Sequence, residues 1–293
     1  MSTPTAPAPV TVWDEAHLAR AAFSHVISGS DPFLRMRLDV DDPAEVWADA
    51  SLNNDRYMGR IGALGLQPGN IPAKAEANGW RFIIPGDDEW PAHFDHLGTE
   101  TPIGLWACGP VRAADASRGR DAIAFAGPRA STAEQDNLAA QIGHTLAEAS
   151  KTLITGLSLG TQQHALAAAL DAGGRVLAVT PGQRPGLPLN DIADRITTSG
   201  VLVSHRPFDL TPTRVDYAQT MRIVAALAEG LVFTEAPGLS TAHIAFQTAV
   251  KLHRGLYVQP GHPKTDALAD LEAAATFTST ADLIEAIDRE DVL

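Results

Sequence analysis

From residue 80 onward, short apolar runs alternate with longer segments in which apolar residues recur at helical spacing. In the segment 131–150, for example, Leu138, Ile142 and Leu146 fall on one face of a helix. We interpret the apolar runs as strands at 81–85, 104–108, 121–127, 151–156, 175–182, 200–206, 231–236 and 256–261. We interpret the amphipathic segments as helices at 131–150, 161–174, 217–230 and 240–255. This alternation predicts an α/β fold with a doubly wound, mostly parallel sheet.

The first 70 residues have a different pattern, in which apolar residues stand at helical spacing without intervening strands. They predict a tail at 1–12 and a small helical module at 13–70. The segment 67–79 contains two prolines and two glycines, which favour turns over regular elements. We therefore place a domain boundary there and expect the α/β core to comprise residues 78–293.

The composition and charge of the chain argue against several classes of protein. The chain has 293 residues, of which 45% are hydrophobic, and a formal net charge of −13. This acidity argues against a duplex binder, because such proteins neutralise phosphates with an excess of Lys and Arg. The single cysteine, Cys108, excludes a disulfide framework or a cysteine-rich zinc site within one chain. No stretch reaches the ~18–20 apolar residues of a membrane span, and no signal-peptide pattern is present, so we expect a cytoplasmic protein without membrane contacts.

Turn-forming sequences, most of them containing glycine, follow several predicted strands. In a parallel sheet the carboxyl ends of these strands share one edge, and the following helices direct their positive N-termini toward it. Glycine also lets the backbone approach a ligand closely. These turns therefore predict an anion-binding rim. They lie at 127–129, 155–161, 180–186, 235–241 and 260–265.

Two features suggest other chemistry. Ser158 lies in Gly-Leu-Ser-Leu-Gly, which matches the nucleophile elbow of serine hydrolases. A hydrolase also needs a histidine beside the serine, and nothing in the pattern turns the ring of His164 toward Ser158, so we expect no hydrolase activity. His93, Asp95 and His96 do not have the spacing of a known metal-ligand frame, and we expect no metal site.

Taken together, these stretches resemble the DprA/Smf family of DNA-processing proteins, which bind single-stranded DNA and load the recombinase RecA. The resemblance covers nearly the whole chain and includes "RFIIPGDDEWPAHFDHL", "IAFAGPRAST", "ITGLSLGTQQHALAAALDAGG" and the helix start "YAQTMR". It implies an extended Rossmann-like core preceded by a SAM-like helical module. It also implies a protein that is not an enzyme and needs no cofactor, with single-stranded DNA, RecA and a second copy of the chain as partners.

The departures from the family pattern concern polar positions of the rim. The family's helix start has an aromatic residue followed by Arg-Asn-Arg, whereas Thr220 and Met221 replace the first two of these here. The family's Asp and His after the second turn are Gln162 and Leu166. Pro128 removes one N–H donor from the first turn. We therefore expect weaker binding of single-stranded DNA, with a shallower dependence on salt, than in a relative with the full basic set.

The rim and the resemblance together give a set of expected contacts. Basic side chains would contact phosphates, an exposed tyrosine would stack on a base, and glycines and hydroxyl groups would shape the turns. The expected residues are Gly127, Arg129, Thr155, Gly156, Ser158, Gly160, Arg214, Tyr217, Arg222, Ser240, Thr241 and Lys264. Two alternatives remain: a small nucleotide-derived ligand on the same rim, or a degenerate relative that acts through protein contacts alone.

Overall fold

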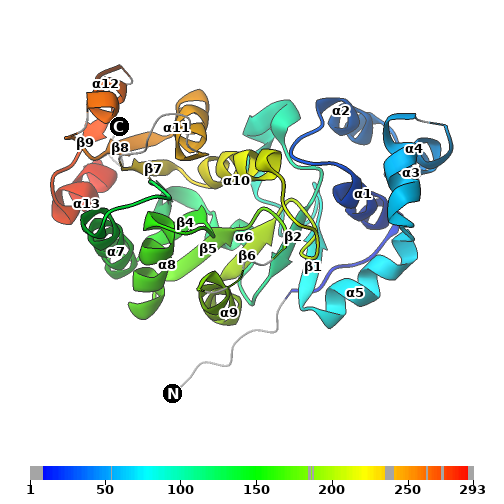
Figure 1. The fold of residues 1–293 in the computed structure, drawn as a ribbon, viewed down its shortest axis with the longest axis horizontal. Helices are drawn as coiled ribbons and strands as arrows, with labels where there is room; N and C mark the ends of the chain where they lie inside the picture. The colour runs from blue at the N-terminus through cyan, green and yellow to red at the C-terminus, as the bar shows by residue number, and fades with distance from the viewer. Residues whose placement is uncertain are drawn as a thin grey trace.

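The computed structural model describes residues 9–53, 55–183, 186, 188–234, 241–261, 263–271 and 274–289. Within this part, one nine-stranded sheet has the order β1-β2-β6-β5-β4-β3-β7-β8-β9 (Figure 1). Its strands are β1 (Trp80–Ile83), β2 (Leu105–Cys108), β3 (Ala122–Ala126), β4 (Thr152–Gly156), β5 (Arg175–Val179), β6 (Val201–Ser204), β7 (Gly230–Phe233), β8 (Gly255–Val258) and β9 (Ala275–Thr276). The pairs β1–β2 and β2–β6 are antiparallel and the other pairs are parallel.

Helices precede the sheet and connect its strands. The first helices, which form the helical module, are α1 (Glu15–Val26), α2 (Pro32–Val40), α3 (Pro43–Leu52), α4 (Asp55–Leu64), η1 (Pro68–Asn70) and α5 (Ile71–Ala77). The others are η2 (Ala92–Glu100), α6 (Ala113–Ala116), η3 (Gly119–Asp121), α7 (Ala133–Glu148), α8 (Thr161–Asp171), α9 (Leu189–Ser199), α10 (Arg214–Ala226), α11 (Thr241–Lys251), α12 (Pro263–Leu271) and α13 (Thr280–Arg289).

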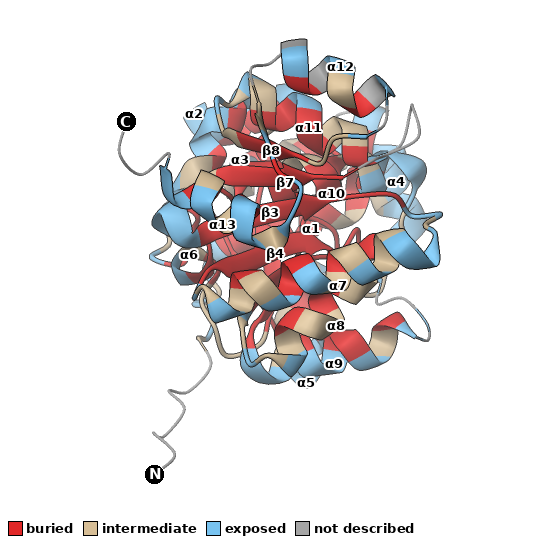
Figure 2. Cartoon of the chain, turned by 90° about the vertical axis from the view of Figure 1, so that its left-hand side faces the viewer, coloured by how far each residue is buried: buried red, intermediate tan, exposed pale blue. Residues whose placement is uncertain are grey.

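The two faces of the sheet are covered by different helices. On one face, strand side chains pack with η2, α6, α10, α11 and α12. On the other face they pack with α7, α8, α9 and α13. In Figure 2 the strands are buried between helices whose outward faces are exposed. The sheet therefore has the doubly wound, mostly parallel arrangement that the alternation of strands and helices predicts, and the fold class is confirmed.

The helical module packs in two ways. It has a cluster of its own that includes Phe23, Leu34 and Tyr57. It also contributes Ala22 of α1 and Ile71 of α5 to the cluster that covers one face of the sheet. The antiparallel extension β1–β2 thus provides the surface on which the module rests, beside the β6 edge of the parallel strands (Figure 1).

Local sequence explains several helix starts. Thr132 and Gln135 form a reciprocal capping box at α7. Asp42 caps α3 and is followed by Pro43, which suits the first helical position. Outside the helical region expected at 13–70, the sequence pattern does not predict α5, α6, α9, α12, α13 or the short strand β9. No helix in the described part is long and apolar enough to cross a bilayer.

Candidate nucleic-acid interface

The turns after β3 and β4 pack against each other through their backbones. Gly160, with φ of +84°, begins α8, and a Cβ atom there would lie 2.3 Å from the carbonyl oxygen of Arg129. The Thr161 N–H and hydroxyl donate to the Pro128 carbonyl at 3.2 and 3.1 Å. A Cβ atom on Gly127 would lie 2.4 Å from the hydroxyl of Thr234. These two glycines are therefore required by close packing, and the Pro128 carbonyl occupies the first amide of α8.

A pocket of about 290 Å³ opens beside these turns, and we call it the rim pocket. Three predicted contact residues, Arg129, Ser158 and Tyr217, line it together. They come from the turns after β3 and β4 and from the first turn of α10. Thr180 and Gln183, from the turn after β5, also line it and were not selected individually from the sequence. The remaining lining residues are Leu157, Leu159, Pro181, Gly186, Leu189 and Pro212.

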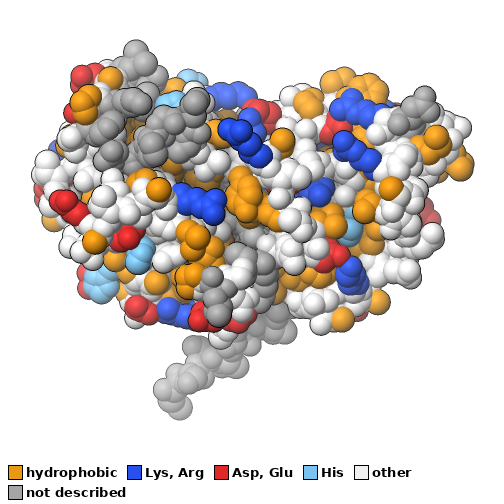
Figure 3. Space-filling view, viewed as in Figure 1, with side chains coloured by type: hydrophobic (Ala, Val, Ile, Leu, Met, Phe, Trp, Pro, Cys, Tyr) orange, Lys and Arg blue, Asp and Glu red, His pale blue; other side chains and the backbone are white. Residues whose placement is uncertain are grey.

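The rim pocket combines one cation with exposed apolar surface. Arg129 is the only Lys or Arg among the described residues that line it, and it is exposed without an ion pair to any of them or to the rest of the described part. Tyr217 is 37% exposed and Leu159 38% exposed, so both present apolar surface to the solvent. In Figure 3, hydrophobic side chains lie beside basic ones over the region of α8 and α10. A cation next to an exposed ring suits a phosphate attached to a base or another flat group.

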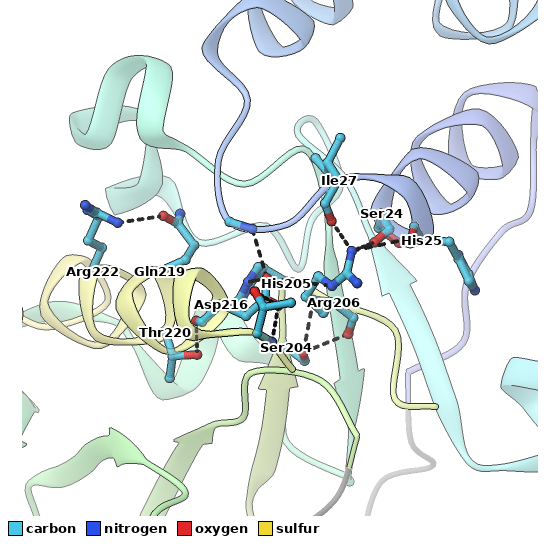
Figure 4. A network of polar contacts seen from close by, with 12 residues as sticks. Ser24, His25, Ile27, Ser204, His205, Arg206, Asp216, Gln219, Thr220 and Arg222 are labelled. Atoms are coloured by element: carbon cyan, nitrogen blue, oxygen red, sulfur yellow. Dashed lines mark hydrogen bonds and ion pairs between the residues drawn. The ribbon is translucent and has the colours of Figure 1, made fainter. Parts of the chain in front are cut away.

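Arg214 and Arg222 lie outside the rim pocket. Arg214 is exposed at the start of α10 and has no ion pair within the described part of the chain. The Nε atom of Arg222 lies 3.2 Å from Glu100 Oε1, and Lys251 contacts the other oxygen of this carboxylate at 2.7 Å. Figure 4 shows Arg222 and Gln219 on the side of α10 that faces η2. The structure therefore does not bring Arg222 together with Arg129.

The other predicted contact residues differ in their exposure to solvent. Thr155 is fully buried, and its hydroxyl donates to the Phe125 carbonyl at 2.7 Å, so it braces neighbouring strands. Gly156 lies against Gln162 and Met221, which a Cβ atom would approach to 3.2 and 3.4 Å. Thr241 is exposed at the start of α11. Ser240 and the side chain of Lys264 lie outside the described part.

Two departures from the family pattern contact each other. Gln162 is buried, and its Nε2 atom lies 3.7 Å from the sulfur of Met221, which is also buried. Thr220 is buried as well, and its hydroxyl donates to the Asp216 carbonyl at 2.9 Å. An arginine substituted at position 220 would therefore enter a packed site. Such an arginine could reach a phosphate only if the neighbouring side chains moved, because Thr220 points into the protein.

Ser158 has a neighbour that does not support nucleophilic catalysis. Its hydroxyl donates to the Gln162 side chain. His164 lies 3.4 Å from Asp136 Oδ2, and in the described part no histidine is hydrogen-bonded to Ser158. An amide oxygen cannot take a proton from serine as an imidazole does.

We therefore expect no stoichiometric labelling of Ser158 by a fluorophosphonate probe, with the same background in Ser158→Ala. Intact-mass spectrometry after incubation with the probe measures this. A single adduct that is present in the wild type and lost in Ser158→Ala would contradict the expectation.

A buried polar network fixes the first turn of α10 (Figure 4). Asp216 accepts the N–H groups of Thr213 at 2.8 Å and of Gly29 at 2.9 Å, and His205 lies 3.4 Å away. The Arg206 guanidinium contacts the same carboxylate at 3.7 Å and donates to backbone carbonyls at the end of α1, including that of Ser24 at 3.1 Å. The helix that carries Tyr217 is thereby tied to the helical module.

Burial and charge set the protonation states in this network. Burial alone would raise the pKa of Asp216, but hydrogen bonds from His205 and Thr213 outweigh this and hold the pKa at about 2. Burial lowers the pKa of His205, which keeps its ring neutral at pH 7. The carboxylate is therefore the anionic partner of Arg206. This network was not predicted from the sequence. The spacing of Thr213 and Asp216, which form a capping box at the start of α10, is the local signal that indicates part of it.

The strand order and the rim define the class of protein. From β3 the chain adds β4, β5 and β6 on one side, whereas β7 and β8 lie on the other. The rim pocket lies at the carboxyl ends of β3, β4 and β5, close to this switch point. This is a Rossmann-like α/β protein with its candidate site at the edge where such folds bind ligands.

Comparison with known proteins identifies the family. Residues 81–288 match the family model "DNA recombination-mediator protein A". A putative DNA processing protein DprA from Mycobacterium tuberculosis is 32% identical over 228 residues, which cover 71% of this chain and 57% of that protein. The chain therefore belongs to the DprA/Smf family, as the sequence motifs predict, and spans little more than half the length of this relative.

Solved structures agree with the fold. DprA from Streptococcus pneumoniae superposes with a TM-score of 0.71 at 20% identity, covering 94% of this chain and 98% of that one. DprA from Helicobacter pylori, whose single-stranded DNA binding mode has been described, gives a TM-score of 0.60 at 19% identity over 72% of this chain and 96% of that one. At these identities the likeness concerns the fold. Both findings confirm the Rossmann-like class.

Proposed function

We propose that this chain binds single-stranded DNA at the rim pocket and assists recombinase (RecA) loading during recombination or DNA uptake, without catalysing a reaction. The observation that carries the proposal is the placement of Arg129, Tyr217 and Ser158 around one pocket at the sheet edge. Membership of the DprA/Smf family supports it, as does the single-stranded DNA binding of the H. pylori relative. We also propose that two copies of the chain bind the DNA strand together as a homodimer.

Fluorescence anisotropy with a labelled single-stranded oligonucleotide, a matched duplex and a nucleotide panel tests this function. We expect the single strand to bind more tightly than the duplex, because the described lining of the pocket offers one cation and an exposed ring rather than an extended basic face. The molar mass from light scattering, with and without DNA, shows whether the protein is a dimer. The rate of RecA filament growth on single strands coated with this protein measures RecA loading. The absence of single-strand binding at low salt would refute the proposal.

Arg129→Ala is expected to weaken single-strand binding about tenfold, because it removes a charge-assisted phosphate contact. It should also make the log–log salt dependence shallower by ~0.7, the contribution of one contact to a single strand. Salt titrations of the wild type and the variant measure both effects. Arg118→Ala is the matched control, because Arg118 is exposed before β3, at the opposite edge of the sheet. Equal effects of the two variants would remove Arg129 from the site.

The second candidate is a small nucleotide-derived ligand in the same pocket. Two observations support it. Among the described residues that line the rim pocket, one is basic, and positions 220 and 221, where the family has Arg and Asn, are buried. A nucleotide that binds in the panel and is released by Arg129→Ala, while no oligonucleotide binds, would establish this function instead. If neither a nucleotide nor an oligonucleotide bound, the remaining candidate function would be action through protein contacts alone.

A further inference from the structure

A second pocket, of about 260 Å³, lies between the helical module and the loop that joins β6 to α10. We call it the module pocket. The helical module contributes His25 and Lys74, the loop contributes Phe208 and Asp209, and Trp106 comes from β2. None of these residues belongs to the rim pocket.

The module pocket has aromatic walls. The Trp106 and Phe208 rings meet edge to face with centroids 5.8 Å apart, and His25 meets Trp106 in the same way at 6.0 Å. Trp80 stacks on Phe208 from within the core, at 5.4 Å and an interplanar angle of 9°. Phe208 is therefore held in a fixed orientation. Trp106 is 1% exposed, so the ring surface open to another flat ring comes from Phe208 and His25, which are partly exposed.

Two hydrogen-bond acceptors at this pocket lack partners. His25 Nδ1 donates to the Ala21 carbonyl at 2.9 Å, which leaves Nε2 as an acceptor without a partner in the described part. Burial lowers the pKa of His25, so the ring stays neutral. One oxygen of Asp209 pairs with Lys74, and the other, Oδ1, is buried with no hydrogen-bond partner among the described residues. Unpaired acceptors of this kind favour a ligand that donates N–H groups.

The module pocket and the rim pocket share one loop. Phe208, Asp209 and Leu210 line the first, and Pro212 lines the second. Two residues of chain span at most about 7 Å, so the pockets are neighbours. Gln183 of the rim pocket donates its N–H to the Leu210 carbonyl at 2.9 Å, which fixes the loop between them. A strand whose backbone contacts the rim therefore passes close to the module pocket.

We propose that the module pocket binds a nucleobase that carries an exocyclic amino group, namely cytosine, adenine or guanine, from the strand bound at the rim. The base stacks on the partly exposed ring of Phe208, and its N–H groups donate to His25 and Asp209. Thymine has no exocyclic amine and binds more weakly. This inference rests on the proposed function, since it names the part of the strand that enters the pocket. Lys74 offsets the negative charge of Asp209, which would otherwise repel a nucleic acid.

Free nucleosides test the pocket without the rest of the strand. In protein labelled with 5-fluorotryptophan, the ¹⁹F resonance of Trp106, assigned with Trp106→Phe, reports on its occupation. Cytidine or adenosine is expected to shift this resonance with an affinity at least about fivefold higher than that of thymidine. Asp209→Asn should reduce the preference, and Asp115→Asn, an exposed aspartate near the amino edge of the sheet, should leave it unchanged. No shift with any nucleoside, or equal affinities, would overturn the inference.

Oligonucleotides separate this inference from the proposed function. Wild-type protein is expected to bind oligo(dC) at least about fivefold more tightly than oligo(dT) of the same length. Arg129→Ala should weaken both, whereas Asp209→Asn should weaken mainly oligo(dC). Binding without base preference, or a preference that Asp209→Asn does not alter, would refute the module pocket while the proposed function stands. Failure of every oligonucleotide to bind would refute the proposed function, and the nucleoside titration would then decide whether the pocket accepts a base.

Discussion

Asp216→Asn is expected to lower the free energy of unfolding by about 3 kcal/mol, because it leaves a buried cation without its partner. The carboxylate is fully buried and accepts N–H groups from Thr213 and Gly29. An amide of the same size offers one acceptor oxygen and turns an NH₂ group toward one of these donors. Arg206 then lacks its counter-charge, although it retains the carbonyl groups at the end of α1. Urea unfolding at pH 7 measures the loss.

The same variant should show a defined dependence on pH. The pKa of Asp216 is about 2 in the folded protein against an ordinary 3.8, so ionisation of this group favours the folded state. Its contribution is complete above about pH 4 and is lost as the pH falls toward 2, and it amounts to about 2 kcal/mol. The difference in stability between the wild type and Asp216→Asn should therefore be constant from pH 7 to pH 5 and should shrink below pH 4. A constant difference down to pH 2.5 would contradict the assignment.

Asp282→Asn is the matched control for Asp216→Asn. Asp282 also accepts backbone N–H groups at a helix start, those of Thr278 and Ser279, but it is exposed and has no buried cation beside it. We expect a clearly smaller loss of stability, since water can replace the missing bonds. Similar losses in the two variants would mean that Asp216 acts only as a helix cap.

Gly160→Ala is expected to destabilise the protein by about 3 kcal/mol and to weaken binding at the rim pocket. The added Cβ atom would lie 2.3 Å from the Arg129 carbonyl and 2.6 Å from the Pro128 carbonyl. These are backbone atoms, so the turn after β3 must move and carry the Arg129 side chain with it. Thermal unfolding measures the stability, and anisotropy with a single-stranded oligonucleotide measures the binding.

Gly173→Ala separates backbone strain from this clash. Gly173 has φ of +69° near the C-terminal end of α8, and a Cβ atom there would meet no heavy atom within 4 Å. The expected loss is about 1 kcal/mol, with unchanged affinity for DNA, because only the left-handed conformation opposes the substitution. If Gly160→Ala behaved in the same way, the contact between the two turns would not be what positions Arg129.

The periodicity of the sequence predicts most of the regular elements because burial imposes it directly. The strands within the runs 121–127 and 151–156, namely 122–126 and 152–156, are buried at every position and carry no charged residue, as expected for parallel strands covered on both faces. The helix at 131–150 follows from its apolar stripe and its capping box, which are local signals. The helix α5 was missed because Pro68, Gly69 and Pro72 suggest turns, whereas in the structure its apolar residues pack against α1 and β1.

The sequence likewise predicts some features of the candidate site and not others. The sequence predicts which turns meet at the rim, because strand direction places their carboxyl ends at one edge. It does not show the direction of each side chain along α10, where Tyr217 faces the rim pocket and Arg222 pairs with Glu100. That depends on how the helix is rotated against the sheet and η2.

By itself, the sequence determined the family, the alternation of strands and helices and the sheet edge at which we propose that a ligand binds, because each follows from local spacing and strand order. Only the tertiary structure decided that Thr155, Thr220 and Met221 are buried and that, among the described residues, Arg129 is the one cation that lines the rim pocket. It alone brought Asp216 and Arg206 to the end of α1 and placed an aromatic pocket between the module and the sheet. These features depend on contacts between residues far apart in the chain, and no local pattern records them.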